Sequence, residues 1–227
     1  MKILSITTSS PVCGVAILEN EEIIKEINLE NGLTHSETLM PIIKSTLEEA
    51  NISLKDIDLL VVDRGPGSFT GIRIGIATAK AFADALNIKT IGVNSLEGLA
   101  MNVESEGIIC SLIDAKRENV FNEIVENKNG ALITKREPSF DNIDILLEEI
   151  QSKYNGLTIT FVGDGALNYK DKILTKLPSS LFLKNNTLNA KNIAILGAKY
   201  IDNDDYFNIE PLYLRKSEAE QKCENNV

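Results

Sequence analysis

A glycine-rich turn over residues 65–68, with the sequence G-P-G-S, carries the residue types in this chain most suited to binding chemistry. It follows the apolar run 59–62 and precedes a helix expected from about Thr70 to Leu86. Unpaired N–H groups at such a helix start can hold a phosphate. The spacing matches neither a P-loop nor the dinucleotide fingerprint. We therefore favour a tight turn made for packing, and keep as an alternative a nucleotide at a partner interface near Gly65, Gly67 and Ser68.

His35 is the only histidine, and it limits the catalytic sites that the chain can build. A metal site with two histidines is excluded, and a Ser/His/Asp or Cys/His site would depend on His35 alone. His35 lies where a helix is expected to begin, which favours a structural or interface role. The three cysteines, Cys13, Cys110 and Cys223, are far apart and indicate neither a disulfide framework nor a cysteine-rich metal site.

Composition describes an ordinary globular chain of 227 residues with 43% hydrophobic residues and a formal net charge of −10. No apolar run reaches the roughly 20 residues of a membrane span, and the first residues do not form a signal peptide, so we expect no membrane association and a cytoplasmic location. Proteins that grip a phosphate backbone concentrate Lys and Arg. This acidic chain is expected to meet nucleic acid only through a partner.

The first half must position the turn and His35, and its pattern predicts three strands followed by helix crossovers. Thr34 and Glu37 form a capping box for a helix with Leu39, Ile43 and Leu47 on one face. Pro41 should bend this helix or move its start toward Met40. The order βββαβαβ is that of a ribonuclease-H-like half. Its expected strands cover residues 2–9, 12–18, 22–29, 59–62 and 88–93.

The second half repeats the strand pattern, which predicts a duplicated α/β architecture. After a helix near 95–103, strands are expected at 108–113, 120–125 and 131–135, with Asn129-Gly130 as a hairpin turn. Asp141 should cap an amphipathic helix, and the sequence T-I-T-F-V-G-D-G should be a strand entering a turn. A last helix is expected over 189–201. We predict a first lobe at 1–103, a smaller second lobe at 104–216 and a flexible tail at 217–227.

One face of the expected helix 70–86 carries almost no side chain, because small residues recur every four positions. Glycine inside a helix costs roughly 1 kcal/mol relative to alanine, so two glycines suggest a compensating gain from close packing. A partner helix could approach this face closely. The small residues are Gly71, Gly75, Ala79 and Ala83.

Several segments in the same order resemble the TsaB (YeaZ) family. They are T-H-S-E-T-L-M-P, D-R-G-P-G-S-F-T-G-I-R-I-G, I-G-V-N-S-L-E-G-L, D-A-K-R-E-N-V-F and L-Y-L-R. The resemblance implies the actin/Hsp70/sugar-kinase (ASKHA) fold, with two ribonuclease-H-like lobes in tandem. It also implies a role in making threonylcarbamoyladenosine beside the anticodon of tRNAs that read codons beginning with A. Such proteins work with TsaD, which carries the metal and transfers the threonylcarbamoyl group, and with the ATPase TsaE.

Two departures favour a noncatalytic subunit. Ser95 and Leu99 stand where TsaD-like relatives have two metal-binding histidines, and neither side chain replaces an imidazole on a transition metal. We expect Ser95 to cap the next helix instead. Thr7 stands where nucleotide-hydrolysing members of the fold place an acidic residue to organise magnesium. We therefore expect no cofactor bound by this chain alone, with ATP or ADP and metal on the partner subunits.

The resemblance places the partner contact on the two helices of the first lobe, where TsaD or a second copy of the chain would form a helical bundle. The expected interface residues are His35, Leu39, Ile43, Gly71, Ile72, Gly75, Ala79 and Ala83. Two alternatives stay open: an enzyme of the same fold, either a small-molecule kinase or a peptidase, and a homodimeric regulator that acts without TsaD. For Asp114 and Arg117 we expect an ion pair within the second lobe.

Overall fold

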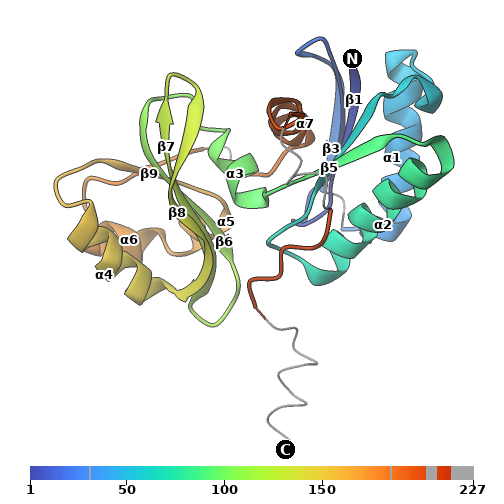
Figure 1. Ribbon diagram of the computed structural model, residues 1–227. Coiled ribbons are helices and arrows are strands. Elements are labelled where there is room, and N and C mark those ends of the chain that lie inside the picture. The colour runs from blue at the N-terminus through green and yellow to red at the C-terminus, as the bar shows by residue number, and fades with distance from the viewer. Residues whose placement is uncertain (31, 185, 203–208, 216–227) are drawn as a thin grey trace, which may run out of the picture.

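A computed structural model describes residues 1–30, 32–184, 186–202 and 209–215, and these form two lobes, each built on a mixed five-stranded sheet (Figure 1). In the first sheet, β1, β2 and β3 form an antiparallel meander, and β4 and β5 run parallel to β1. The strand order is β3-β2-β1-β4-β5. The elements of this lobe are β1 (Lys2–Thr7), β2 (Cys13–Glu19), β3 (Glu22–Leu29), α1 (His35–Ala50), the 3-10 turn Leu54–Asp56, β4 (Leu59–Asp63), α2 (Phe69–Leu86) and β5 (Lys89–Val93).

The second sheet repeats the first, with the order β10-β9-β6-β7-β8. Its first three strands are again an antiparallel meander, and β9 and β10 are added in parallel beside β6. The same order in both sheets confirms the predicted duplication. The elements are α3 (Ser95–Ala100), β6 (Gly107–Asp114), β7 (Asn119–Lys128), β8 (Ala131–Asn142), α4 (Ile143–Lys153), β9 (Ile159–Val162), α5 (Asp164–Asn168), α6 (Lys170–Lys176), β10 (Leu181–Phe182) and α7 (Ala190–Lys199).

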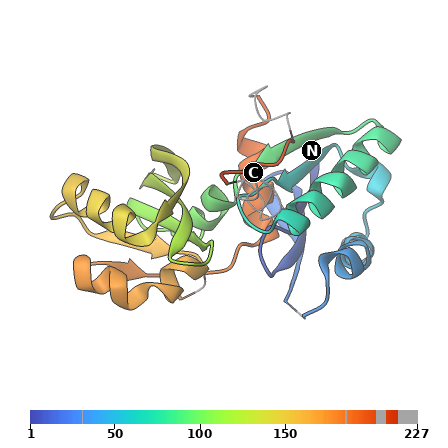
Figure 2. The ribbon, with the colours of Figure 1, turned by 90° about the horizontal axis from the view of Figure 1, so that it is seen from below.

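Helix α7 lies on the first lobe, although we expected it within the second lobe. Figure 2 shows the two lobes side by side, with the orange α7 against the first. The Ser5 hydroxyl on β1 donates a hydrogen bond to the Ala190 carbonyl at 2.7 Å, and Gly197 lies so close to Val61 that a Cβ there would overlap it. The first sheet has α1 and α2 on one face, so its other apolar face needs a cover, and the amphipathic α7 supplies it. The chain after β10 thus returns to the first lobe, in contrast to the expected lobe at 104–216.

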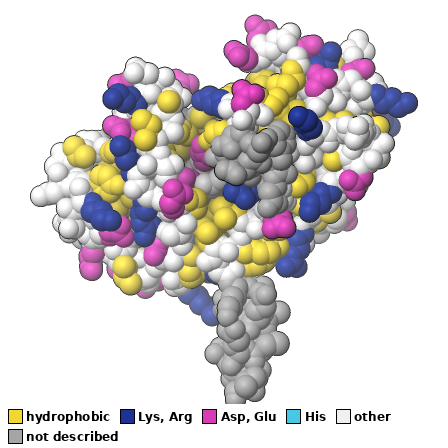
Figure 3. Space-filling view, viewed as in Figure 1, with side chains coloured by type: hydrophobic (Ala, Val, Ile, Leu, Met, Phe, Trp, Pro, Cys, Tyr) yellow, Lys and Arg dark blue, Asp and Glu magenta, His cyan; other side chains and the backbone are white. Residues whose placement is uncertain are grey.

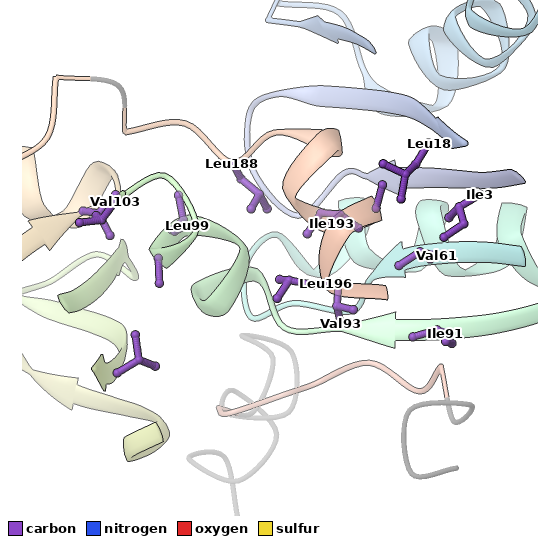
Figure 4. Close-up of a cluster of buried hydrophobic side chains, with 14 of the residues drawn as sticks. Ile3, Leu18, Val61, Ile91, Val93, Leu99, Val103, Leu188, Ile193 and Leu196 are labelled. Atoms are coloured by element: carbon purple, nitrogen blue, oxygen red, sulfur yellow. The ribbon is translucent and has the colours of Figure 1, made fainter. Parts of the chain in front are cut away.

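Apolar side chains from both lobes join in one buried cluster around α3 and α7 (Figure 4). Val61 and Val93 come from the first sheet, Ile193 and Leu196 from α7, and Leu99 from α3. Each such side chain contributes roughly 1.5–3 kcal/mol when fully buried. The lobes are therefore packed together on this side as well as linked by the chain.

Helix α1 begins at His35, directly after the predicted Thr34–Glu37 capping box, which confirms that prediction, and the alternative start near Met40 is wrong. The Glu37 carboxylate accepts a hydrogen bond from the Thr34 N–H at 3.1 Å, which fixes the first turn, and the ring of Pro41 lies exposed on the outer side. The bonds from the hydroxyl and N–H of Thr34 hold the pKa of Glu37 below its ordinary value. Within the described residues, no helix combines the length and hydrophobicity that a membrane span requires.

Candidate functional site

Asp63, at the end of β4, is the centre of the glycine-rich turn. Its carboxylate is fully buried and accepts hydrogen bonds from the Thr7 hydroxyl at 2.8 Å and the Gly65 N–H at 2.8 Å. It also accepts from the Ser9 N–H at 3.3 Å and from the Ser95 hydroxyl. Four donors around one carboxylate satisfy a buried charge, so this network holds the ends of β1 and β4 to the start of α3.

The turn itself packs directly on the loop between β1 and β2. A Cβ at Gly67 would overlap the carbonyl oxygen of Ser9, and that oxygen accepts a hydrogen bond from the Ser68 N–H at 2.7 Å. Ser68 caps α2 through its hydroxyl, which accepts from the Gly71 N–H at 3.2 Å. Because the N–H groups of Gly65 and Ser68 already donate within the chain, the geometry favours the packing interpretation. A nucleotide near Gly65, Gly67 and Ser68 stays a prediction.

The small-residue face of α2 is not open to a partner helix. A Cβ at Gly71 would overlap the carbonyl oxygen of Thr8, and the Thr8 hydroxyl donates to the Gly71 carbonyl at 2.7 Å. Gly75 lies against the same threonine, and Ala79 is fully buried. The close approach that the glycines permit is therefore made inside this chain by Thr8, directly after β1. The sequence shows that something packs closely on this face, but not what.

Burial removes most of the expected interface residues from the surface. Leu39, Ile43 and Ile72 are exposed by at most 2% and belong to the core between the first sheet and its two helices. Of the eight residues expected, only His35 and Ala83 are partly exposed. A partner on these helices must contact their outer sides instead.

The outer sides of α1 and α2 form a surface that we call the α1–α2 face. On α1 it presents exposed apolar groups, with Met40 51% exposed and Leu33 60% exposed just before the helix. A groove of about 660 Å³ runs between the starts of the two helices, with Ile74 in its wall. The exposed residues of this face include Leu33, Thr34, Ser36, Glu37, Met40, Pro41, Lys44, Glu48 and Glu49 before and along α1, and Thr70, Arg73, Ala77, Lys80, Ala81, Asp84 and Ala85 along α2. The predicted apolar interface residues lie on the inner side of the helices instead, although Ala77, Ala81 and Ala85 repeat the four-residue spacing of small residues on this face.

His35 joins α1 to the loop after β1. Its Nε2 lies 2.8 Å from the Ser10 carbonyl oxygen, so this nitrogen carries the proton and donates. The ring lines both the groove of the α1–α2 face and a cleft between the lobes. This geometry fits the structural role that the sequence favours for His35.

The cleft between the lobes has a volume of about 510 Å³ and mixed chemistry. Lys116 and Arg215 lie in its wall together with Asp114, Asp164 and Glu30. Asp114 accepts from the Lys116 ammonium at 2.7 Å and from the Tyr169 hydroxyl at 3.3 Å. Burial opposes ionisation of Asp114, but the bonds from Lys116 and Tyr169 outweigh it and lower the pKa of this carboxyl. The expected ion pair at Asp114 thus exists with Lys116 and not with Arg117, whose side chain is exposed.

A hydrated magnesium ion, which nucleotide-hydrolysing members of this fold require, does not fit the residues at the first hairpin. Thr7 is fully buried, and its hydroxyl is already bound to Asp63. The Asp63 carboxylate in turn faces four protein donors. Among the residues that the structure describes, no group of three or more His, Cys, Asp or Glu side chains could hold a metal ion.

Ser95 does not cap α3, contrary to expectation. The cap is Asn94, whose side-chain oxygen accepts from the Leu96 N–H at 2.9 Å. Ser95 is fully buried, and its hydroxyl lies 3.0 Å from that of Ser9 besides donating to Asp63. Placing the cap one residue earlier frees Ser95 to join the Asp63 network.

A buried glutamate, Glu123, and a half-buried one, Glu97, form a second polar cluster that was not predicted. Glu123 on β7 is only 4% exposed and accepts from the Asn94 amide at 2.8 Å, and Glu97 on α3 accepts from the Tyr200 hydroxyl. Burial raises the pKa of Glu123 to about 8 and that of Glu97 to about 7. A glutamate inside the apolar strand V-F-N-E-I-V was the available signal.

The family model for TsaD, described as tRNA N6-adenosine threonylcarbamoyltransferase, matches residues 30–223. The TsaB protein of Bacillus subtilis is 32% identical over 228 residues, which is 98% of this chain and 97% of the relative. This chain belongs to the TsaD/TsaB-like family. TsaB of Escherichia coli is 33% identical over 134 residues, covering 57% of this chain and 58% of that protein.

Solved structures confirm the fold. YeaZ from Pseudomonas aeruginosa superposes with a TM-score of 0.80 at 22% identity, covering 94% of this chain and 99% of that one. A ROK hexokinase from Thermus thermophilus gives a TM-score of 0.51 at 10% identity and covers 89% of this chain and 100% of its own. The predicted ASKHA architecture, with two ribonuclease-H-like lobes in tandem, is therefore correct.

Proposed function

We propose that this chain is a noncatalytic subunit in the biosynthesis of tRNA threonylcarbamoyladenosine, and that it binds a TsaD-like transferase through the α1–α2 face. The full-length similarity to a TsaB protein supports the pathway. The observation that carries the binding role is the α1–α2 face itself, a pair of neighbouring helices with exposed apolar and small side chains around a groove.

The chemistry of this face suits contact with other helices. The alanines along the outer side of α2 allow a close helix–helix approach, while Met40 and Leu33 supply apolar contact area. Arg73, Lys80 and Asp84 lie among them and would set the register of the contact through charge. A two-helix surface of this kind pairs naturally with two helices of a partner, which gives a four-helix bundle.

Catalysis is assigned to the partner because this chain offers Ser95 and Leu99 where a metal would need histidines, and both are buried in other roles. ATP or ADP and the metal would be held by the TsaD-like and TsaE-like subunits. Lys and Arg side chains are scattered among Asp and Glu on the face seen in Figure 3, which supports contact with tRNA only through the complex. We place the protein in the cytoplasm, where this modification would occur.

The test is to mix the protein with the TsaD-like protein of the same organism and to measure the mass of the complex by light scattering, with and without ATP. Met40→Asp puts a charge into the α1–α2 face without touching the core, and it should weaken the complex at least about tenfold, equivalent to 1.4 kcal/mol. Ile145→Asp is the matched control, because Ile145 is 63% exposed on α4 of the other lobe.

Two outcomes would contradict the proposal. If wild type forms no mixed complex under any nucleotide condition, the chain acts alone or as a homodimer. If Met40→Asp and Ile145→Asp bind equally well, the complex uses another surface. A homodimer that disappears as the mixed complex forms would show that a second copy and the TsaD-like subunit compete for the same face.

A further inference from the structure

The segment 209–215 runs across the gap between the two lobes and is attached to both. On the first lobe, Ile209 is 5% exposed and belongs to the core between the sheet and its helices. The Leu212 N–H donates to the Arg64 carbonyl at 2.8 Å. The Tyr213 ring stacks on Phe69 of α2 with ring centres 4.8 Å apart.

A hydrogen bond to its hydroxyl holds the Tyr213 side chain on the first lobe. The Arg73 Nε donates to the Tyr213 hydroxyl at 2.7 Å, and the Arg73 guanidinium lies 5.5 Å from the centre of the Tyr213 ring. Both Phe69 and Arg73 belong to the first turns of α2, so this attachment is made to a rigid element.

The next two residues are attached to the second lobe. Leu214 packs against the buried cluster of Leu96, Ala115 and Phe121. Arg215 donates from its NH1 nitrogen to the Ala115 carbonyl at 3.0 Å. Its guanidinium also lies 5.6 Å from the centre of the Phe121 ring and 5.8 Å from that of Phe140, distances at which a cation is attracted to an aromatic face.

The position of this segment allows it to restrict the angle between the lobes. In Figure 1, α7 packs between the lobes on the upper side, whereas the red segment 209–215 crosses on the lower side. Arg215 lines the cleft between the lobes. A joint that is packed on one side only can open on the other, and a segment fixed to both bodies on that other side restricts the opening.

We propose that residues 209–215 act as a strap that sets the opening of the cleft, with Tyr213 as its clasp on the first lobe and Arg215 as its clasp on the second. The two clasps act in series: once the second-lobe end is released, loosening the first-lobe end, where Ile209 and the Leu212 N–H stay attached, has no restraint left to weaken. This gives the strap a signature that two independent packing contacts would not have: the effects of removing both clasps do not add.

The experiment measures the distance between the lobes by single-molecule energy transfer at picomolar protein, where copies of the chain are separate. Dyes are attached at Glu22→Cys on β3 and Ser152→Cys on α4, both exposed positions, in a Cys223→Ser background. Cys13 and Cys110 are buried, and burial raises the pKa of both thiols, so they stay protonated and do not compete for the dye.

Wild type should give one narrow distance distribution. Arg215→Ala should broaden it toward longer distances. Tyr213→Ala should broaden it less, because Ile209 and the Leu212 N–H still hold the first-lobe end, and the double variant should broaden it no further than Arg215→Ala. Arg117→Ala is the control. It removes an exposed arginine from the β6–β7 hairpin that Arg215 contacts through the Ala115 carbonyl, and it should leave the distance distribution unchanged. Circular dichroism checks that each variant is folded, and Arg215→Lys, which keeps the charge but not the planar fork, replaces Arg215→Ala if that variant unfolds.

Two results would overturn the strap. One is a distance distribution for Arg215→Ala, or for its lysine replacement, that superimposes on wild type. The other is a double variant whose broadening is the sum of the two single effects, because this would mean that the two residues stabilise their own lobes independently.

Discussion

The Glu123–Glu97 pair makes the stability of this protein depend on pH in a direction opposite to that of a typical salt-bridged carboxylate. Glu123 has a pKa near 8 in the folded chain, against 4.5 as its ordinary value, because burial disfavours its charge and the nearby Glu97 and Glu137 add repulsion. The folded state therefore binds this proton more tightly than the unfolded state. Stability should be highest below about pH 4.5 with respect to this group and should fall as pH rises toward about 8.

The size of the effect follows from the two pKa values. One pH unit corresponds to 1.36 kcal/mol, so raising the pKa from 4.5 to about 8 costs on the order of 3–5 kcal/mol once the carboxyl is ionised. Glu97, with a pKa near 7, titrates with it as a coupled pair, and Lys199 partly offsets the burial of Glu97. A loss of this size is a large part of the stability of an ordinary domain.

Glu123→Gln isolates the contribution of this carboxyl. Glutamine has the same shape, and its oxygen can still accept the bond from Asn94, but it carries no proton to lose. Urea unfolding followed by circular dichroism at pH 5, 7 and 9 gives the free energy of unfolding of each variant. We expect wild type and Glu123→Gln to be similar at pH 5, and the variant to be more stable by on the order of 3 kcal/mol at pH 9.

Glu126→Gln is the matched control on the same strand. Glu126 is paired with Lys135 at the surface, and the bond from Lys135 lowers the pKa of Glu126. This variant should keep the full decline of wild type between pH 5 and pH 9. A difference between wild type and Glu123→Gln that stays constant over that range would refute this explanation, since the difference cancels the titration of the groups that are not coupled to Glu123, and the groups coupled to it here are Glu97 and Glu137.

Two further predictions concern the packing around the turn. Gly71→Ala should lower the free energy of unfolding by at least about 2 kcal/mol, because its Cβ would overlap the Thr8 carbonyl. Ala81→Leu, on the outer side of α2, should change it by less than about 0.5 kcal/mol. Equal effects of the two variants in urea unfolding would contradict the assignment of the buried and outer sides of α2. Asp63→Asn should cost on the order of 2–4 kcal/mol, because an amide cannot accept from all of the donors now facing the carboxylate. A thermal midpoint within 2 °C of wild type for Asp63→Asn would show that the network contributes little.

Much of the fold could be predicted because its signals are local. The strands of both meanders alternate or cluster apolar residues over short stretches, and Asn129-Gly130 marks its hairpin within two residues. The order of elements then leaves few topologies, since parallel strands need helical crossovers. The return of α7 to the first lobe was missed because an amphipathic helix shows that it has an apolar face but not which sheet that face covers.

The candidate site was predicted only in part for the same reason. The four-residue spacing of Gly71, Gly75 and Ala79 correctly indicated close packing. Small residues are needed at these positions whether the neighbour is the chain just after β1 or a partner helix, so the sequence does not tell the two apart. Leu39 and Ile43 were placed on one face of α1, and that face is the core side of the helix. The Glu97–Glu123 cluster joins a residue of α3 to a residue of β7, and no local pattern brings them together.

The sequence by itself determined the duplicated α/β order, the glycine-rich turn with its cap at Ser68 and the family, because each depends on neighbouring residues or on the order of segments along the chain. Tertiary structure alone decided which side of α2 is buried, which carboxylate accepts the hydrogen bond from the Ser95 hydroxyl, and that residues 209–215 cross from one lobe to the other. These are contacts between residues far apart in sequence. Their partners are selected by burial and hydrogen bonding across the whole molecule, which a local pattern does not encode.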